Sequence, residues 1–337
     1  MLLTFDDVLL RPKFSDILSR FNNQIDLTTK VTKRYSISQP IISSNMDTIT
    51  EGEMACLMAK TGGLGIIHRF LSIQEQVNEV SDTNCELVAA AVGVKDDFIE
   101  RAQALDEAGV DIICIDMAHG HHILMKEAIT KIKKAVRDHI DIIAGNVCTE
   151  QGFISLADWG ADAIKVGVGC GAMCKTRLVT GFGIPQLSAI MQCDYGRDEE
   201  NYIPIIADGG IRNSGDMVKA FAAGADTVMI GSLLSGTDET PGNLIIIDGV
   251  AYKKYRGQAS RDFQVEYYAN TNKHTEGEST LVKYKGSAEH IITELIGGIR
   301  SGFSYGNIHS FAEKRNLTMV EVSSNTIIEN QIRKGAI

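Results

Sequence analysis

Residues 163–168 read Ala-Ile-Lys-Val-Gly-Val, and the chain continues with Gly-Cys-Gly-Ala-Met-Cys-Lys-Thr-Arg up to residue 177. The apolar run predicts a β-strand, and the glycines at alternate positions predict a sharp turn that points backbone groups inward. This turn delivers Cys174 into a loop, with Lys175, Thr176 and Arg177 beside it. Because nearby cations lower the pKa of a thiol, we expect Cys174 to be a nucleophile. The alternative is a flexible loop that carries an incidental cysteine.

The same alternation of a short apolar run and an amphipathic stretch extends along most of the chain. Continuous apolar runs are typical of parallel strands that are buried on both faces. Eight such strands separated by helices predict an α/β fold, a (β/α)8 TIM barrel. A doubly wound sheet is the alternative, but no G-x-G-x-x-G follows an early strand with an acidic residue about 20 positions later. The expected strands are 40–44, 64–68, 87–94, 110–116, 141–146, 163–168, 204–208 and 227–230, with helices between them that include 53–60, 123–137 and 216–223.

Polar residues and glycines stand at the ends of these predicted strands. In barrels of this kind, the C-terminal strand ends carry the active site. The sequence therefore predicts one site, built from Asn45, Asp47, His68, Arg69, Asp116, Asn146, the Cys174 loop, Asp208, Gly209, Gly210, Gly231 and Ser232.

The chain is expected to form a single barrel domain over residues 1–337, with one long insertion. Residues 237–285 follow the eighth predicted strand and are rich in Tyr, Lys, Asn, Glu and Gly. Insertions of this length are usually active-site lids or disordered linkers, and we interpret this one as a lid. A helix over 288–300 is expected to close the barrel. No structure is assigned to the tail over 307–337.

Composition excludes several classes of function. The net charge of −10 argues against nucleic acid as a partner, since a basic patch is the usual footprint of such binding. No run of about 18 apolar residues predicts a membrane span, and Asp6 and Asp7 stand where a signal segment would begin. The seven cysteines are scattered without CxxC pairs, which favours a reduced, cytoplasmic protein.

The loop and its surroundings resemble the IMP dehydrogenase and GMP reductase family. Its signature, G-x-G-x-G-S-x-C-x-T-R followed by G-x-G-x-P-Q, is matched by residues 167–177, with Ala172 in place of the serine, and by residues 181–186. The resemblance extends from 3–10 to 297–302. Many dehydrogenases of this family carry a regulatory module of paired cystathionine-synthase-type repeats after the second strand. Here residues 76–80 lead directly through 81–84 into the third strand, so the resemblance implies a barrel without that module.

The resemblance implies a catalytic trio. Cys174 would add to C2 of a purine nucleotide, which divides one difficult step into two easier ones. Thr176 and the lid residue Glu276 would then protonate the departing ammonia. Taken alone, Thr176 could be a capping hydroxyl and Glu276 a solvated surface residue.

The resemblance also implies a nucleotide site at the strand ends. Asp208 would bind the ribose hydroxyls, small residues would bind the phosphate, and the segment after residue 256 would approach the base. Tight turns are the alternative explanation for the glycines. The implied substrate-binding residues are Asp208, Gly209, Gly210, Gly231, Ser232, Gly257, Gln258, Ala259 and Gly277.

The implied cofactors are a reduced nicotinamide dinucleotide, NADPH or else NADH, and K⁺. Backbone carbonyls of Gly169, Gly171 and Cys174 would bind the K⁺. A histidine metal site at His119, His121 and His122 is not expected, because no carboxylate stands at ligand spacing. The dinucleotide would be bound by Asp116, Met117, Ala118, Asn146, Arg69, Ser19, Arg20 and Ser301. A homotetramer is also implied.

Within the family, three features favour the reductase. Asn45 stands where dehydrogenases typically show proline, residues 185–190 continue with Leu-Ser rather than Ile-Thr, and the lid lacks the Arg-Tyr pair of the dehydrogenases. Against this, His119 replaces the usual asparagine, and residues 48–51, 65–68 and 255–257 look like those of dehydrogenases. Cys170, Ala172 and Lys175 depart from both patterns. The alternatives are therefore an IMP dehydrogenase that oxidises IMP to XMP with NAD, and a catalytically silent nucleotide-binding barrel.

Overall fold

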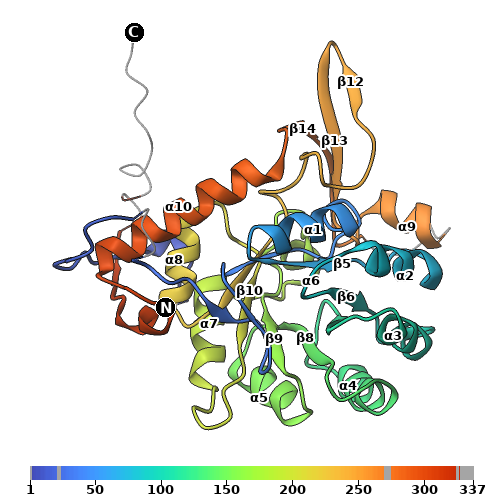
Figure 1. Cartoon of the computed structure of the whole chain (residues 1–337), viewed down its shortest axis with the longest axis horizontal. Coiled ribbons are helices and arrows are strands. Elements are labelled where there is room, and N and C mark those ends of the chain that lie inside the picture. Colours follow the sequence, from blue (N-terminus) through green and yellow to red (C-terminus); the bar gives the residue numbers. More distant parts are fainter. Residues whose placement is uncertain (1, 21–23, 269–274, 324–325, 327–337) are drawn as a thin grey trace.

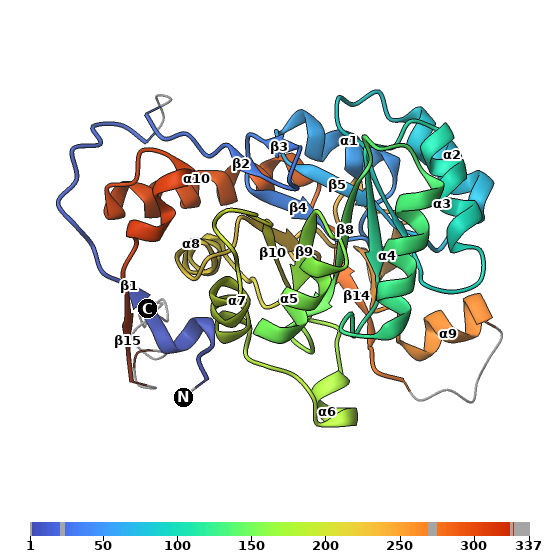
Figure 2. The same cartoon turned by 90° about the horizontal axis from the view of Figure 1, so that it is seen from below.

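Eight parallel strands form a closed barrel at the centre of the fold (Figures 1 and 2). The computed structural model describes residues 2–20, 24–268, 275–323 and 326. The strands follow one another in sequence order, and the last pairs with the first to close the barrel. The predicted (β/α)8 fold is confirmed. The strands are β4 (Ile41–Ser43), β5 (Leu64–Ile67), β6 (Ala89–Val92), β7 (Ile112–Asp116), β8 (Asp141–Val147), β9 (Ala163–Val166), β10 (Ile205–Asp208) and β11 (Thr227–Ile230).

The observed strands lie inside the predicted ranges, except that β8 continues one residue further. Their side chains alternate between two apolar layers, as the pleat of a strand requires. Within β9, Ala163 belongs to the cluster inside the barrel, whereas Ile164 and Val166 pack outward against the helices. This alternation explains why both faces are apolar and why the strands appear in the sequence as continuous runs.

Helices surround the barrel on its outer side (Figure 2). Their starts are fixed by local chemistry: Ser72 and Glu75 form a capping box at α2, and the Asn213 side chain accepts from the amide of Asp216 at α8. The final helix runs past its predicted end at 300, because the chain turns into the left-handed conformation only at Asn307. The helices are α1 (Gly52–Lys60), α2 (Ile73–Asp82), α3 (Phe98–Glu107), α4 (Ile123–Ala135), α5 (Glu150–Asp158), α6 (Thr176–Thr180), α7 (Gln186–Tyr195), α8 (Ser214–Ala222), α9 (Arg261–Tyr268) and α10 (Ala288–Gly306).

Segments before and after the barrel complete the fold. The hairpin of β2 (Thr29–Lys30) and β3 (Ser36–Ile37) lies at the N-terminal end of the barrel, where the Thr32 hydroxyl donates to the Asp141 carboxylate at the start of β8. After the short helix η1 (Phe5–Asp7), β1 (Val8–Leu10) pairs antiparallel with β15 (Met319–Glu321). The tail, to which the sequence assigned no structure, thus includes β15 and the short helix η2 (Phe311–Asn316).

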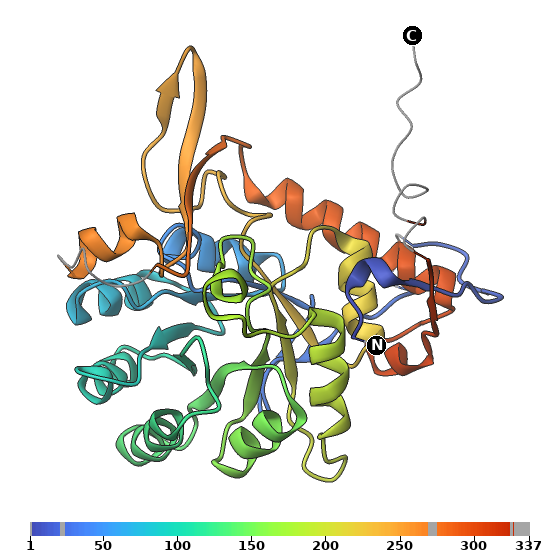
Figure 3. The same ribbon diagram turned by 180° about the vertical axis from the view of Figure 1, so that it is seen from behind.

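The insertion after β11 is an ordered sheet rather than a loop. Strands β12 (Ile245–Ile247), β13 (Val250–Arg256) and β14 (Ser279–Lys283) pair antiparallel and project from the barrel (Figures 1 and 3). The inner end of β13 and the helix α9 return to the strand ends. Residues 269–274 of the predicted lid lie outside the described residues.

Candidate active site

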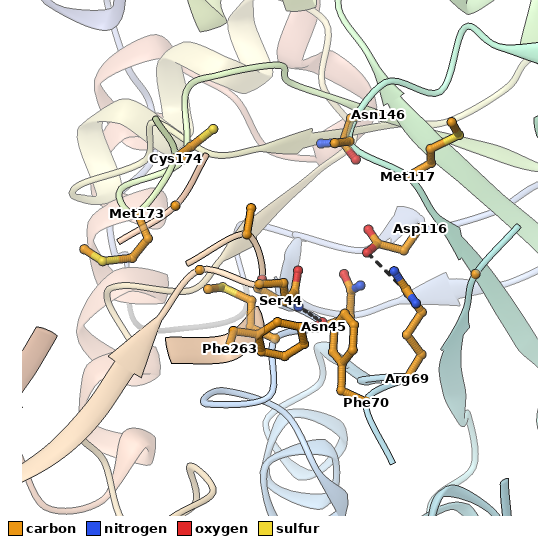
Figure 4. A pocket seen from close by; sticks show the side chains of 18 of the residues that line it. Ser44, Asn45, Arg69, Phe70, Asp116, Met117, Asn146, Met173, Cys174 and Phe263 are labelled. Carbon is orange, nitrogen blue, oxygen red and sulfur yellow. Dashed lines mark hydrogen bonds and ion pairs between the residues drawn. The ribbon is translucent and has the colours of Figure 1, made fainter. Parts of the chain in front are cut away.

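A cavity of about 1130 Å³ opens at the C-terminal ends of the barrel strands. Residues from the strand ends form its floor, and the Cys174 loop and the insertion form its sides. Figure 4 shows Cys174 on one side of this cavity and Asp116, Asn146 and Arg69 on the other. The site therefore lies where the strand-end rule predicts it.

The predicted trio of Cys174, Thr176 and Glu276 is brought together in this cavity. The Cys174 thiol donates to the Thr176 hydroxyl, with 3.1 Å between Sγ and Oγ1. The Thr176 hydroxyl in turn donates to the Glu276 carboxylate, with 2.9 Å between Oγ1 and Oε2. A continuous hydrogen-bonded path thus joins the thiol to a carboxylate that lies 100 residues beyond Thr176 along the chain.

Backbone pairing fixes this arrangement. The Lys175 amide donates to the Glu276 carbonyl over 2.6 Å, and the Glu278 amide donates to the Met173 carbonyl over 3.0 Å. Cys174 and Gly277 form an antiparallel bridge. The lid segment therefore binds the cysteine loop as a short ribbon, which holds the Glu276 carboxylate beside the thiol.

The cations next to Cys174 have other partners. The Lys175 ammonium forms an ion pair with the Glu278 carboxylate, and the Arg177 guanidinium donates to the Ile184 carbonyl over 2.6 Å. Both cations thus interact with groups other than the thiol, whereas the Thr176 hydroxyl contacts the thiol directly.

A second polar cluster crosses the floor of the cavity. The Lys165 ammonium lies 3.1 Å from Oδ1 of Asp116 and 3.2 Å from Oδ2 of Asp208. The Asn146 amide donates to the same Asp208 oxygen over 2.8 Å, and Arg69 lies 4.0 Å from Asp116. Burial alone would raise the pKa of Asp116, but the charges of Lys165 and Arg69 outweigh it and the pKa is lowered. Both predicted ribose carboxylates therefore belong to one network.

Lys165 is a site residue that the sequence analysis missed. Its signal is visible in the quoted strand, where a lysine interrupts an apolar run. A fully buried lysine is rare unless it is paired, so a lysine in a barrel strand indicates carboxylates on neighbouring strands.

The predicted substrate residues divide into two groups. The cavity wall contains Asp208, Gly209, Gly257, Gln258, Ala259 and Gly277. Gly210, Gly231 and Ser232 lie outside the wall, although Ser232 hydrogen-bonds Tyr255, which is part of it. Gly209 has a φ of +92°, and a Cβ there would lie 2.8 Å from the Cys170 sulfur, so a side chain would force the loop away.

The predicted dinucleotide residues also divide. Arg69, Asp116, Met117, Ala118 and Asn146 line the cavity. The remaining three lie apart from the wall, where the Arg20 guanidinium donates to the Ser301 hydroxyl over 2.7 Å and Ser19 precedes it in the chain.

The cavity instead continues past Arg69 into an arm that the sequence analysis missed. The strand-end rule could have found it, because most of the arm follows β6. Its wall includes Ser72, Glu75, Gly93, Val94, Lys95, Asp96, Asp97 and Arg101.

Aromatic side chains from the barrel and the insertion form one wall of the cavity. Phe70 packs edge-on against Phe263 with 4.6 Å between the ring centroids, and Phe263 stacks on Tyr267 at 4.4 Å. The Tyr267 hydroxyl donates to the Phe70 carbonyl over 2.6 Å. These contacts attach α9 to the loop after β5, so the insertion covers the cavity from one side.

Two expectations concern metals and membranes. Within the described ranges, no group of three or more His, Cys, Asp or Glu side chains is placed to bind a metal ion. The Gly171 carbonyl, one of the proposed K⁺ ligands, accepts from the Cys174 amide over 3.1 Å. Among the residues with described placement, no helix has the length and apolar character to cross a membrane.

The fold and these contacts define a (β/α)8 barrel with a cysteine-centred polar cavity at its strand ends. The family model described as IMP dehydrogenase / GMP reductase domain matches residues 2–333. The chain belongs to this family of oxidoreductases, which act on purine nucleotides.

Relatives with both activities are found. The chain is 35% identical to the inosine-5'-monophosphate dehydrogenase of Nitrosopumilus maritimus over 468 residues, which cover 98% of this chain and 97% of the relative. It is 40% identical to that of Cryptosporidium parvum over 386 residues, with coverages of 98% and 94%. Among solved structures it resembles a variant of GMP reductase from Trypanosoma brucei in complex with guanosine 5'-monophosphate. That match has a TM-score of 0.93 and 29% identity, and it covers 100% of this chain and 98% of the other.

Proposed function

We propose that this chain is a GMP reductase, which converts GMP to IMP and ammonia with NADPH as reductant. The observation that carries the proposal is the path from the Cys174 thiol through the Thr176 hydroxyl to the Glu276 carboxylate. Reductive deamination needs a nucleophile that can be reversibly attached to C2 and a group that protonates ammonia as it leaves. The path places the nucleophile, Cys174, and the proton donor, Glu276, on the same side of the cavity and joins them through Thr176.

In the proposed reaction, the Cys174 sulfur attacks C2 of GMP while the thiol proton moves through Thr176 to Glu276. Glu276 then returns a proton through the same path to the 2-amino group, the C2–N bond breaks, and ammonia leaves. This leaves a covalent thioimidate between the sulfur and the nucleotide. A reduced nicotinamide bound beside Asp116 would supply the hydride that C2 needs. Cys174 leaves C2 as a thiolate when the C–S bond breaks. The overall change is GMP, NADPH and two protons to IMP, NADP⁺ and ammonium.

The cavity residues fit the two ligands that this reaction needs. A volume of about 1130 Å³ exceeds the roughly 300–1,000 Å³ of a pocket for one drug-sized molecule. We assign Asp208 to the substrate ribose, and Asp116 with Arg69 to the nicotinamide ribose, because carboxylates accept hydrogen bonds from ribose hydroxyls. NADPH is the proposed donor and NADH the alternative. K⁺ is proposed at the carbonyls of the cysteine loop.

IMP dehydrogenase is the second candidate, and the names of the curated relatives favour it. The reductase is supported by Asn45, whose side chain hydrogen-bonds Asp116 and whose carbonyl accepts from Gln258 over 2.8 Å. A proline at this position, as in the dehydrogenases, could not make the side-chain bond. Within the described part of the insertion no arginine is followed by a tyrosine, so the Arg-Tyr pair of the dehydrogenases does not occur there, although residues 261–264 resemble a dehydrogenase lid segment.

We also propose that residues 1–337 form one domain with a lid over 237–285, that no regulatory module is inserted between α2 and β6, and that the protein works as a cytoplasmic homotetramer. Continuity from α2 into β6 supports the second point.

Parallel turnover assays test the proposed function. One reaction contains purified protein, K⁺, GMP and NADPH, and the other contains IMP and NAD⁺. Consumption of NADPH with equal release of ammonia is the expected result. Reduction of NAD⁺ in the second reaction would assign the chain as a dehydrogenase instead, and no turnover in either would favour a silent nucleotide-binding barrel.

A further inference from the structure

Lys165 lies inside the barrel between the two carboxylates that we assign to the two ribose groups. It occupies the middle of β9 with only 2% of its surface exposed. Asp116 ends β7 and Asp208 ends β10. The strands lie in the order β7, β8, β9 and β10, so the ammonium on β9 links a carboxylate two strands away on one side to a carboxylate on the next strand on the other side. The ion pairs are therefore a bridge between the cofactor side and the substrate side of the cavity.

Electrostatics explains why the three charges occur together. Burial by itself lowers the pKa of Lys165, but the charges of Asp208 and Asp116 outweigh it and raise the pKa. The charges of Asp208 and Asp116 thus keep the buried ammonium ionised, and the ammonium in turn lowers the pKa of Asp116. The neighbouring Cys114 thiol adds no charge, since burial raises its pKa to about 12.

Ionised carboxylates are what ribose binding requires. A deprotonated carboxylate accepts hydrogen bonds at both oxygens, whereas a protonated one loses part of this capacity. Lys165 and Asn146 both contact Oδ2 of Asp208. Among the described residues, no hydrogen bond or ion pair engages Oδ1, which leaves that oxygen as the acceptor for a ligand.

We propose that Lys165 is a positioning residue that keeps Asp116 and Asp208 oriented as hydrogen-bond acceptors and thereby couples the substrate site to the cofactor site. This inference rests on the proposed assignment of the two carboxylates. Lys165 acts through Asp116 and Asp208, and Arg69 and Asn146 act as secondary partners of the same two carboxylates.

The first test measures GMP affinity by calorimetry for wild type, Lys165→Met and Lys165→Arg between about pH 6 and 9. Without the ammonium, the two carboxylates have no cation between them, and their mutual repulsion favours uptake of one proton by the pair. Lys165→Met is expected to weaken GMP binding at least about tenfold at pH 7, which is about 1.4 kcal/mol. The ratio of its affinity to that of wild type should rise with pH as the proton leaves, and taking this ratio cancels the titration of the GMP phosphate near about pH 6. Lys165→Arg should remain within about threefold of wild type, because it keeps the charge.

A double variant separates positioning from a merely structural role. Lys165→Met combined with Asp116→Asn removes both the cation and the second negative charge, so Asp208 loses its repelling neighbour. GMP affinity at pH 7 should then recover at least about threefold relative to Lys165→Met. The two substitutions are not additive, because both change the charge beside Asp208. A double variant as weak as Lys165→Met, or a ratio of Lys165→Met affinity to wild-type affinity that stays flat with pH, would overturn the inference.

Folding is monitored by thermal unfolding, and Lys165→Gln, which is neutral but polar, replaces Lys165→Met if the latter does not fold. Failure of the proposed function is distinguishable, because the assay measures binding rather than turnover. If wild type binds IMP but does not reduce GMP, the series is repeated with IMP. If wild type binds the nucleotide and none of the substitutions changes the affinity, the role of Lys165 is refuted. The proposed function is unaffected by that result.

Discussion

Replacing Glu276 by Gln tests the proton path most sharply, because Glu278 two residues further on offers a matched control. Glu276 accepts from the Thr176 hydroxyl inside the cavity, whereas Glu278 pairs with Lys175 outside its wall. Glu276→Gln keeps the shape of the side chain but removes the carboxylate that takes and returns a proton. General acid–base groups contribute about 10²- to 10⁴-fold to a rate, so we expect a loss in kcat of that size, about 2.7–5.5 kcal/mol.

The control substitution should have a much smaller effect. Both partners of the Lys175–Glu278 pair are partly exposed, with side-chain exposures of 35% and 55%, and pairs of this kind are worth at most about 1 kcal/mol. Glu278→Gln should therefore reduce kcat by no more than about fivefold. The assay follows NADPH absorbance and ammonia release at saturating GMP, with GMP affinity measured separately. Equal losses of kcat in the two variants would refute the proton path. A loss in GMP affinity as large as the loss in kcat would instead make Glu276 a binding residue.

Four further predictions follow from the structure. Cys174→Ala should abolish turnover while GMP binding, measured by calorimetry, changes little; surviving turnover would refute the nucleophile. The kcat/KM for the dinucleotide should stay flat from about pH 8 to about pH 6, because the lowered pKa keeps Asp116 ionised and the carboxylate is lost only as pH falls through that value; a decline near pH 6 would contradict this. Asp226→Asn should destabilise the fold by about 3–5 kcal/mol, measured by denaturant unfolding, because it removes the carboxylate partner of the buried Lys314 ammonium and one of the two carboxylate partners of Arg197, which keeps Asp194; a change below about 1 kcal/mol would show that the pairs contribute little. Replacing K⁺ by Li⁺ should lower kcat, and equal rates would remove the proposed cation site.

The barrel could be predicted from the sequence because its strands are buried on both faces. A strand buried in this way appears as an unbroken apolar run, and each of the eight runs became one strand. Cys174 was predicted from its glycine-rich loop, whereas Thr176 and Glu276 were joined to it only through the family resemblance. Residue spacing alone gives no reason to pair positions 174 and 276, which meet because the lid forms a bridge with the cysteine loop.

Other features were missed because their signals in the sequence are weak or become interpretable only through tertiary contacts. The insertion is polar overall, yet β13 and β14 pair along five positions and form a sheet that composition does not indicate. The cavity arm past Arg69 is lined by a loop whose polar residues look like ordinary solvated residues in sequence. Arg20 and Ser301 hydrogen-bond to each other apart from the cavity wall, so their role at the dinucleotide site stays a prediction. Lys165 was passed over because a single lysine in a strand has no visible partner until the barrel closes.

The most direct test of the central claim is the intact mass of the protein after acid quench, with GMP present and no dinucleotide. The proposed mechanism predicts a covalent adduct equal to GMP minus ammonia, located at Cys174, together with release of one ammonia per site. Cys174→Ala should show neither. Turnover of GMP and NADPH by wild type without any such adduct or early ammonia release would contradict the covalent mechanism.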